Sequence, residues 1–594
     1  MVTIDQLTNL DTSKFTKAAG AWSSVSNRAS SARTRVEHEI LAKLGGTQKG
    51  EAATAVLHRL ATVSKNYEYI HAECGLVRTV LSCLAEELAV SQRKLKQALE
   101  DAEALKFTVK PDGSVEYPRS PGTPLPQLQA PAAPNAMPPI LKPEATADPN
   151  AAKAQAIANR IGDALKDATE IDGRYAKALA ELTTDGNLKN TDRSDIARDT
   201  RDVQRAVGDH LSLSSIPKGK SAKANAEWWN KLSQEKKDEY IALFPAEIGA
   251  LDGLPSTVRD NANRVVLDEA YLDANQKLKE IDAREPKKYE QKFNDMTGLP
   301  IEGEEQISQQ WKFWAEDRKK LTDRLHAMEA IQARLDDTGE EGLPEAYLLG
   351  FSDKGLGRSI VANGNPDTAD HTAVFVPGTT SKLEKSKEYI EHMTDLWKAS
   401  QAKAPGQNVS TITWIGYDAP QSVVPEAMSR TYAWKAAPIL NNFLDGLQTT
   451  QGGPGHSHTT VIGHSYGSTV VGAASIKGDL AANDIVVAGS PGMMVPHAKD
   501  LSVGADHVWS EAASLADDQV PAGGKLAGLG GQTDRLPFSK AIPFGYALTQ
   551  NVPSDRDFGA HIMKNDAEGH GDYWRKGSVS LDNQANVVSG TMTG

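Results

Sequence analysis

Hydrophobic residues recur at intervals of three and four along two long segments near the start of the chain. The first segment spans residues 15–36 and the second spans residues 56–88. This repeat places the hydrophobic side chains on one stripe of a helix, and two such stripes bury each other when a turn joins the helices. Gly45 and Gly46 lie between the segments. Residues 1–108 are therefore predicted to form an antiparallel helical hairpin.

Proline dominates the next segment, residues 109–150. Between Pro111 and Pro149 the chain has 11 of its 30 prolines. Proline lacks a backbone N–H and fixes φ, so this composition argues against a helix or a sheet and predicts an extended tether. A ligand for an SH3-type domain is the alternative.

A helical pattern returns over residues 151–345, which are rich in Ala, Glu, Lys, Asp and Leu. Ser233 is a predicted helix N-cap within this region. Tryptophans stand in two groups with helical spacing, and we interpret them as packing anchors, with a platform for a sugar or another ligand as the alternative. They are Trp228, Trp229, Trp311 and Trp314.

Beyond Tyr347 the pattern changes to short β-branched runs separated by helix-length segments. Continuous apolar runs of this kind predict parallel strands covered on both faces, so residues 346–594 are expected to form one α/β domain. The runs are HTAVFV (371–376), NVSTITW (408–414), HTTVIG (458–463), DIVVAG (484–489) and DHVWS (506–510).

A candidate nucleophile follows the strand HTTVIG directly. The sequence Gly463-His464-Ser465-Tyr466-Gly467 leads into a segment of small residues suited to a helix start. The pattern G-x-S-x-G between a strand and a helix is typical of a nucleophile elbow, in which a strained turn presents the serine hydroxyl. Ser465 is therefore the predicted nucleophile, and a Gly-rich turn without chemistry is the alternative.

A serine nucleophile needs a base that a carboxylate orients, and in this type of fold the chain order is serine, acid, histidine. Asp518 follows Ser465 by 53 residues (518 − 465), and His570 follows Asp518 by 52 (570 − 518). Each interval accommodates a strand and a helix, so these two residues complete the predicted triad. The fallback acids are Asp517 and Asp534, and the competing histidines are His561 and His464.

An oxyanion hole needs two backbone N–H groups. The N–H of Tyr466 is the predicted first donor, and Thr379 or Thr380, in the turn after the strand HTAVFV, is the second. No metal or other cofactor is expected, because His456 and His458 lack a third ligand at a suitable spacing. The Gly-rich stretch 521–531 lacks the GK[ST] of a phosphate loop, and we interpret it as a flap near the site.

Length, net charge and cysteine content argue against several further classes of protein. The 594 residues predict several domains, and the net charge of −13 argues against a nucleic-acid partner. Cys74 and Cys83 are predicted on one helix, half a turn out of phase, so no disulfide between them is expected. With neither a signal peptide nor an apolar membrane span readable, the default expectation is a cytoplasmic protein.

Several motifs together resemble a large actinobacterial family of α/β-hydrolase proteins of unknown substrate. They include FSDKGLGRSIVANGNPDTADHTAVFVPGTTS, WIGYDAP, VIGHSYGSTVVG, VVAGSPGM, the DQV of ADDQV and HGDYW, and the likeness covers roughly residues 225–585. The resemblance implies a serine-hydrolase fold with Ser465, Asp518 and His570 at the triad positions. This chain has Gln519 after the acid, where relatives usually have proline.

The N-terminal hairpin resembles the WXG-type hairpins associated with type VII secretion. The usual Trp of the turn is replaced by Gln48, and a Tyr-x-x-x-Glu pattern, Tyr69 to Glu73, lies within the second helix instead of after the hairpin. The resemblance implies export without a cleavable signal peptide as an alternative location. Docking of a protein partner, or self-association through residues 1–108, is the simpler role.

The sequence thus predicts a serine hydrolase of small-molecule esters or related acyl compounds, with an acyl-enzyme intermediate. Ester, thioester and amide substrates all remain open. The alternatives are an interaction protein that keeps a hydrolase scaffold and a serine peptidase with the same triad.

Overall fold

The computed structural model describes residues 2–41, 44, 50–118, 148–182, 193–208, 213–296, 298–532 and 550–592. The chain divides into two compact units. Unit 1 comprises Met1–Arg28, Ile70–Gly186 and Asp199–Leu211, and unit 2 comprises Ala29–Tyr69, Asn187–Arg198 and Ser212–Gly594. The four predicted segments, with boundaries at residues 108, 150 and 345, divide the chain differently and stay a prediction.

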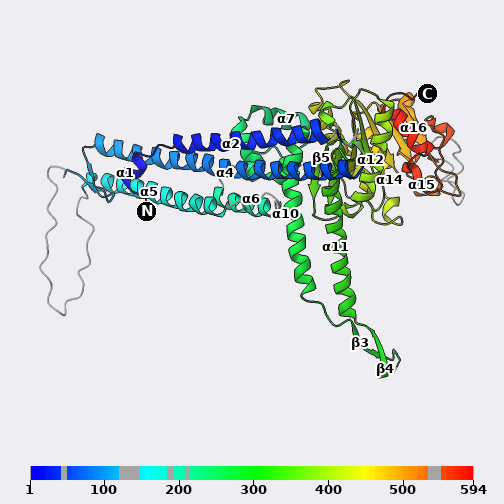
Figure 1. Cartoon of the computed structure of the whole chain (residues 1–594), viewed down its shortest axis with the longest axis horizontal. Helices are drawn as coiled ribbons and strands as arrows, with labels where there is room; N and C mark the ends of the chain where they lie inside the picture. The colour runs from blue at the N-terminus through cyan, green and yellow to red at the C-terminus, as the bar shows by residue number, and fades with distance from the viewer. Residues whose placement is uncertain are drawn as a thin grey trace. The chain divides into compact units, whose positions relative to one another are not determined.

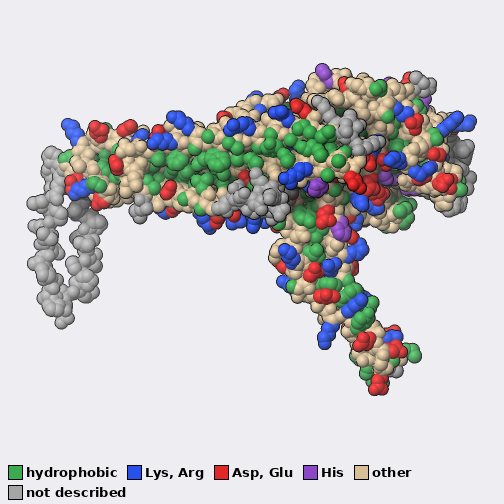
Figure 2. Space-filling model, in the orientation of Figure 1, with side chains coloured by type: hydrophobic (Ala, Val, Ile, Leu, Met, Phe, Trp, Pro, Cys, Tyr) green, Lys and Arg blue, Asp and Glu red, His purple; other side chains and the backbone are tan. Residues whose placement is uncertain are grey.

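Unit 1 is built from long helices (Figure 1). Ser26 Oγ in one of them donates to the carbonyl of His71 in another at 2.8 Å, so these two helices lie side by side. Hydrophobic side chains follow the helices on the face that Figure 2 shows. The predicted turn at Gly45 and Gly46 lies outside the described residues. The helices that contribute to unit 1 are α1 (Ile4–Thr8), α2 (Ser13–Thr34), α4 (Glu51–Ala104), α5 (Pro149–Glu181) and α6 (Arg193–Val207).

The Pro-rich segment begins with a short hairpin that the sequence did not predict. Strand β1 (Thr108–Val109) pairs antiparallel with β2 (Val115–Glu116). The expectation of no sheet is therefore wrong for residues 115–116. Residues 112–117 contain no proline, and Gly113 takes a positive φ of 87° in the turn, so the backbone donors needed for pairing are present. Residues 119–147 lie outside the described residues.

Unit 2 contains an eight-stranded sheet in the order β14-β11-β10-β9-β7-β8-β6-β5. Strands β5 and β6 pair antiparallel, as do β6 and β8, and the other neighbours are parallel. The predicted parallel runs correspond to β7 to β11, whereas β5, β6 and β14 are additional strands. Their bounds are β5 (Ala346–Ser352), β6 (Arg358–Asn363), β7 (His371–Val376), β8 (Val409–Ile415), β9 (His458–His464), β10 (Asp484–Ala488), β11 (Val508–Glu511) and β14 (His561–Ile562).

Helices cover both faces of this sheet. Val374 and Val376 of β7 belong to a core with α13 (Thr431–Thr450) and α14 (Tyr466–Lys477). Their neighbours Ala373 and Phe375 belong to a second core with α12 (Ser386–Lys403) and α16 (Val579–Val588). Successive strand residues point to opposite faces, so the apolar run HTAVFV is buried on both sides. The chain thus has an α/β-hydrolase fold at its C-terminal end, preceded by helices.

Further helices of unit 2 precede the sheet along the chain. They are α7 (Ala222–Lys231), α8 (Gln234–Leu243), α9 (Pro245–Gly249), α10 (Ser256–Asp282) and α11 (Gln309–Asp336), and α15 (Val520–Ala527) follows later. The side chain of Ser233 accepts from the N–H of Lys236, which confirms the predicted cap of α8. Among the described residues, no helix has both the length and the hydrophobicity needed to cross a membrane.

Helices α10 and α11 run side by side to a two-stranded hairpin of β3 (Tyr289–Phe293) and β4 (Pro300–Ile307) (Figure 1). Hydrophobic side chains are visible on the surface of this hairpin, and Met296 is almost fully exposed (Figure 2). The predicted tryptophan anchors differ in burial. Trp229 is buried in α7, whereas Trp311 and Trp314 are half-buried on α11 and line a surface pocket.

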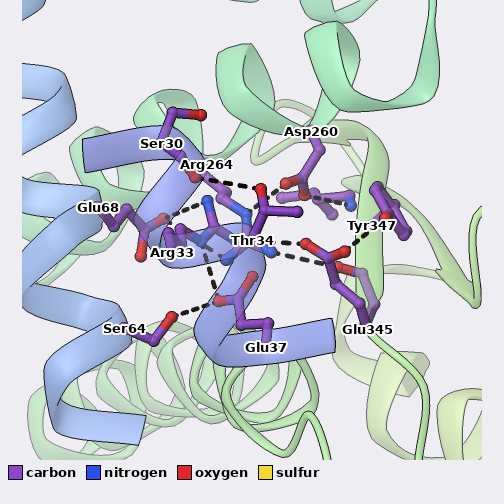
Figure 3. A network of polar contacts seen from close by, with 12 residues as sticks. Ser30, Arg33, Thr34, Glu37, Ser64, Glu68, Asp260, Arg264, Glu345 and Tyr347 are labelled. Carbon is purple, nitrogen blue, oxygen red and sulfur yellow. Dashed lines mark hydrogen bonds and ion pairs between the residues drawn. The ribbon is translucent and has the colours of Figure 1, made fainter. Parts of the chain in front are cut away.

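Within unit 2, residues 29–69 join the hydrolase fold through a buried ionic network (Figure 3). The Arg33 guanidinium contacts Glu37 at 2.9 Å, Glu345 at 3.8 Å and Glu68 at 3.9 Å. Arg264 of α10 contacts Glu68 at 3.5 Å and donates to the Ala346 carbonyl of β5 at 3.2 Å. The network thus connects residues 29–69 with α10 and with the edge strand of the sheet.

Candidate active site

Ser465 occupies the turn between β9 and α14 with a strained backbone, at φ 53° and ψ −131°. Residues other than glycine rarely adopt a positive φ, and such strain concentrates at functional turns. The Ser465 N–H donates to the Ala488 carbonyl at 3.0 Å, and the Ser468 N–H donates to the Ser465 carbonyl at 3.0 Å. These bonds fix the turn at the carboxyl edge of the parallel strands, which is the geometry of a nucleophile elbow.

The two glycines of the motif permit this turn. A Cβ on Gly463 would lie 2.6 Å from Ser468 Cα, and a Cβ on Gly467 would lie 2.0 Å from the Val376 carbonyl oxygen. Both distances are far below van der Waals contact. Glycine is therefore needed at both positions for β9, β7 and the start of α14 to pack this closely.

The turn after β7 lies directly against the elbow. A Cβ on Gly378 would lie 2.7 Å from Ser465 Cβ and 2.9 Å from the backbone nitrogen of Tyr466. The N–H of Thr380 donates to the Pro420 carbonyl at 2.7 Å, so in this conformation it is unavailable to an oxyanion. Of the two predicted second donors, Thr379 is the one that stays a candidate, together with Tyr466 as the first donor.

The predicted acid and base lie in hydrogen-bond contact. His570 Nδ1 is 2.9 Å from Asp518 Oδ2, although 52 residues separate them along the chain. Asp518 lies in the loop between β11 and α15, and His570 lies in the loop after β14. Gly489, directly after β10, provides the space for this pair, because a Cβ there would lie 2.8 Å from Asp518 Oδ2 and 2.9 Å from His570 Nδ1.

Asp518 is buried and held as a carboxylate. Its Oδ2 also accepts from the Tyr573 hydroxyl at 2.8 Å, and its Oδ1 accepts from the Val520 N–H at 2.9 Å. Burial raises the pKa of Asp518, but the hydrogen bonds, that from His570 foremost, outweigh it and hold the pKa below its ordinary value. An ionised Asp518 at neutral pH can orient His570 and stabilise its imidazolium form.

The role of Tyr573 was missed by the sequence reasoning. Its hydroxyl donates to Asp518 and accepts from the Ala513 N–H at 2.9 Å, so it connects the acid to the loop after β11. Burial and the nearby carboxylate raise the pKa of Tyr573, which keeps its hydroxyl protonated as a donor. The sequence signal that could have revealed this role is the position of Tyr573 three residues after His570, in the motif HGDYW.

His464, one of the competing histidines, packs inside the elbow. Its Nε2 lies 2.8 Å from the backbone carbonyl of His570, and since a carbonyl only accepts, His464 donates this bond. Burial, with the neighbouring His570, lowers the pKa of His464 to about 3, so it stays neutral. The two rings lie 4.8 Å apart. His464 thus anchors the loop that carries His570 at the elbow. Ser465, the predicted nucleophile, is the next residue after His464 along the chain.

The remaining candidates lie elsewhere. Asp517 is exposed and accepts from the Ser514 hydroxyl at 2.5 Å. His561 lies in β14 and stacks on Trp509 of the neighbouring strand β11. Asp534 lies outside the described residues. His458 begins β9, and its Nε2 contacts Asp484, the first residue of β10, at 2.9 Å. Both residues therefore lie at the amino ends of their strands, whereas the elbow follows the carboxyl end of β9.

The Gly-rich stretch 521–531 is not the flap that its composition suggested. Most of it forms α15, which ends at Gly528 in the left-handed conformation. A Cβ on Gly524 would lie 1.8 Å from the Pro491 carbonyl oxygen, so the helix packs directly on the segment after β10. Glycine serves close packing here, and the prediction of a flap is corrected to a helix beside the site.

Comparison with known proteins agrees with this fold. Residues 353–527, which include Ser465 and Asp518, match the model of a family described as Alpha/beta hydrolase. The uncharacterized protein Rv2079 of Mycobacterium tuberculosis is 31% identical over 391 residues, which are 63% of this chain and 56% of that protein. This chain therefore spans little more than half the length of that relative.

A second pair of relatives is matched over most of its own length. The uncharacterized proteins Rv0963c of Mycobacterium tuberculosis and Mb0988c of Mycobacterium bovis are each 30% identical over 195 residues. The matched stretch is 32% of this chain and 71% of each relative.

Proposed function

Because this chain belongs to the α/β hydrolase family matched by residues 353–527, we propose that it is a serine hydrolase that cleaves ester or related acyl bonds. One observation carries the proposal: Ser465 stands in a strained elbow, the adjacent His464 bonds to the His570 backbone, and a buried carboxylate holds His570 at 2.9 Å. This set of groups suits nucleophilic catalysis, because the histidine can accept the serine proton while the acid stabilises the resulting charge.

The proposed reaction has two halves. His570 Nε2 takes the proton from Ser465 Oγ as the oxygen attacks the substrate carbonyl, and the N–H groups of Tyr466 and Thr379 bind the oxyanion. The protonated imidazole then donates to the leaving alcohol, which breaks the ester bond and leaves an acyl group on Ser465. Water, deprotonated by His570, releases the acid and restores the serine.

Labelling with a fluorophosphonate probe tests the proposal, because the probe reacts with an activated serine. We expect the purified wild-type chain to be labelled and Ser465→Ala to give no product. His570→Ala and Asp518→Asn should label at least about 100-fold more slowly, since loss of the orienting acid typically costs about 10⁴-fold in turnover and loss of the base about 10⁶-fold.

Two neighbouring residues offer matched controls. Asp517→Asn removes the adjacent exposed carboxylate, and His561→Ala removes the other late histidine, so both should label at the wild-type rate. Absence of labelling in a folded wild-type chain contradicts the proposal and favours a binding role on a hydrolase scaffold. Equal losses in the Asp517 and Asp518 variants contradict the assignment of the acid.

A further inference from the structure

The segment between β8 and α13, residues 416–430, exposes hydrophobic side chains next to the elbow. Val423 is 71% exposed, Val424 is 69% exposed and Met428 is 44% exposed. Single exposed apolar residues are normal on a protein surface, but three within six positions beside a catalytic centre form a patch. Two further observations indicate the kind of ligand that this patch binds: its position relative to the elbow, and the contacts that its charged side chains already make.

Hydrogen bonds hold this segment against the site at both ends. At its start the Pro420 carbonyl accepts from Thr380, and Gln421 Nε2 donates to the Ser381 carbonyl at 3.1 Å. At its end the Tyr466 hydroxyl donates to the Ser429 carbonyl. The segment is therefore bonded both to the turn of the predicted oxyanion hole and to the residue after the nucleophile.

The charged side chains of the segment are engaged in contacts of their own. Asp418 pairs with Arg358 at 3.1 Å, and Glu426 accepts from the N–H of Gln421 at 2.5 Å. Arg430 donates to the Gly528 carbonyl at 2.9 Å. What the segment offers to a ligand is therefore mainly hydrocarbon.

The Arg430 contact brings a second element to the patch. Gly528 caps α15, and Leu526, two residues earlier, is 52% exposed. Its neighbour Lys525 pairs with Asp555 at 2.7 Å, so this charge is also engaged. Along the chain, Met428 is two residues from Arg430 and Leu526 is two residues from Gly528, the two residues that this hydrogen bond joins.

We propose that Val423, Val424, Met428 and Leu526 form an apolar rim that binds the hydrocarbon chain of the substrate, which makes the substrate class long-chain acyl esters. The inference rests on the proposed serine-hydrolase function. A substrate chain fits better than a docked protein, because the segment that carries three of these side chains is hydrogen-bonded to the oxyanion turn and to Tyr466. In addition, four side chains fall far short of the roughly 800 Å² that each partner of a stable complex buries.

The test uses p-nitrophenyl esters from acetate to decanoate, each below the concentration at which it aggregates. Transfer of methylene groups from water to an apolar surface should raise kcat/KM of the wild-type chain by about two- to fourfold per methylene until the rim is covered. In the double variant Val423→Ser with Val424→Ser, the ratio of kcat/KM for decanoate to that for acetate should fall at least about tenfold. Leu526→Gln, on the other element, should lower the same ratio by a smaller factor.

Ile476→Gln is the matched control, because Ile476 is similarly exposed but lies eleven residues (476 − 465) along α14 from the elbow, about 16 Å away. It should leave the ratio unchanged. A wild-type chain that is labelled at Ser465 but shows no dependence on chain length overturns the rim and leaves the proposed function standing. If Ile476→Gln lowers the ratio as much as the rim variants do, that result also overturns the rim and leaves the proposed function standing. Absence of labelling overturns both.

Discussion

Replacement of Glu511 by glutamine should stabilise the hydrolase fold, and the gain should grow with pH. Glu511 ends β11 with its side chain fully buried, and its Oε1 accepts from Gln584 Nε2 at 2.6 Å. Burial raises the pKa of Glu511 from 4.5 to about 8, because the hydrogen bond from Gln584 only partly offsets the loss of solvation. A glutamine has the same shape and can still accept that bond.

The sign and size of the effect come from proton linkage. Between pH 4.5 and pH 8 the carboxyl is ionised in the unfolded chain but protonated in the folded one, so stability falls as pH rises through this window. At about 1.4 kcal/mol per pH unit, the wild-type penalty is under about 1 kcal/mol at pH 5, about 2 at pH 6 and roughly 4 at pH 8. Glu511→Gln removes this penalty.

Urea unfolding of both chains, followed by circular dichroism and tryptophan fluorescence at pH 5, 6 and 8, measures the effect. Glu568→Gln, in an exposed position of the same region, is the matched control and should show no increase across the series. An equal free-energy difference between Glu511→Gln and wild type at pH 5 and pH 8 would refute the reasoning, because a buried neutral carboxyl requires the difference to grow.

Tyr573→Phe should lower kcat about tenfold with little change in KM, since Asp518 loses a hydrogen bond at 2.8 Å that helps keep it ionised and oriented. Gly489→Ala should lower kcat at least about 100-fold in ester hydrolysis, because the added Cβ would lie 2.8 Å from Asp518 Oδ2 and displace the acid from the base. Arg33→Met should destabilise unit 2 by about 3–5 kcal/mol in urea unfolding, as removal of one partner leaves buried carboxylates uncompensated.

Each of these variants has a matched control. Tyr271→Phe removes a tyrosine that also donates to a carboxylate, but on α10, and should keep the wild-type kcat. Gly504→Ala also adds a Cβ at a positive φ, here 84°, but with no atom within 4 Å, so a comparable loss of activity there would contradict the steric argument. Arg35→Met changes an exposed arginine two residues from Arg33, and equal destabilisation by the two would contradict the buried network.

Local patterns and chain order were sufficient for much of the α/β part. The run HTAVFV coincides with β7, and the order of strands along the chain was enough to select Asp518 and His570, whose side chains lie in hydrogen-bond contact. Apolar runs buried on both faces and a strained Gly-x-Ser-x-Gly turn leave strong local signals, because the sequence must satisfy them within a few residues.

Features that depend on contacts between residues far apart along the chain could not be predicted from the sequence. The N–H of Thr380 bonds to Pro420, and that pairing follows from how two loops meet. The glycines of α15 suggested a flap by composition, whereas Gly524 serves close packing on Pro491. The contact of Arg33 with Glu345 could not be predicted either, because nothing near Arg33 in the sequence indicates that Glu345 will reach it.

The ionic network around Arg33 sets an order of events during synthesis. Glu345 follows Arg33 by 312 residues (345 − 33), which at 5–20 residues per second delays its arrival by roughly 15–60 s. Until then the arginine has only its local partners, and the edge strand β5 does not yet exist. Residues 29–69 can therefore complete this network only after β5 has been synthesised, so their packing on the edge strand waits until the middle of the chain has been made.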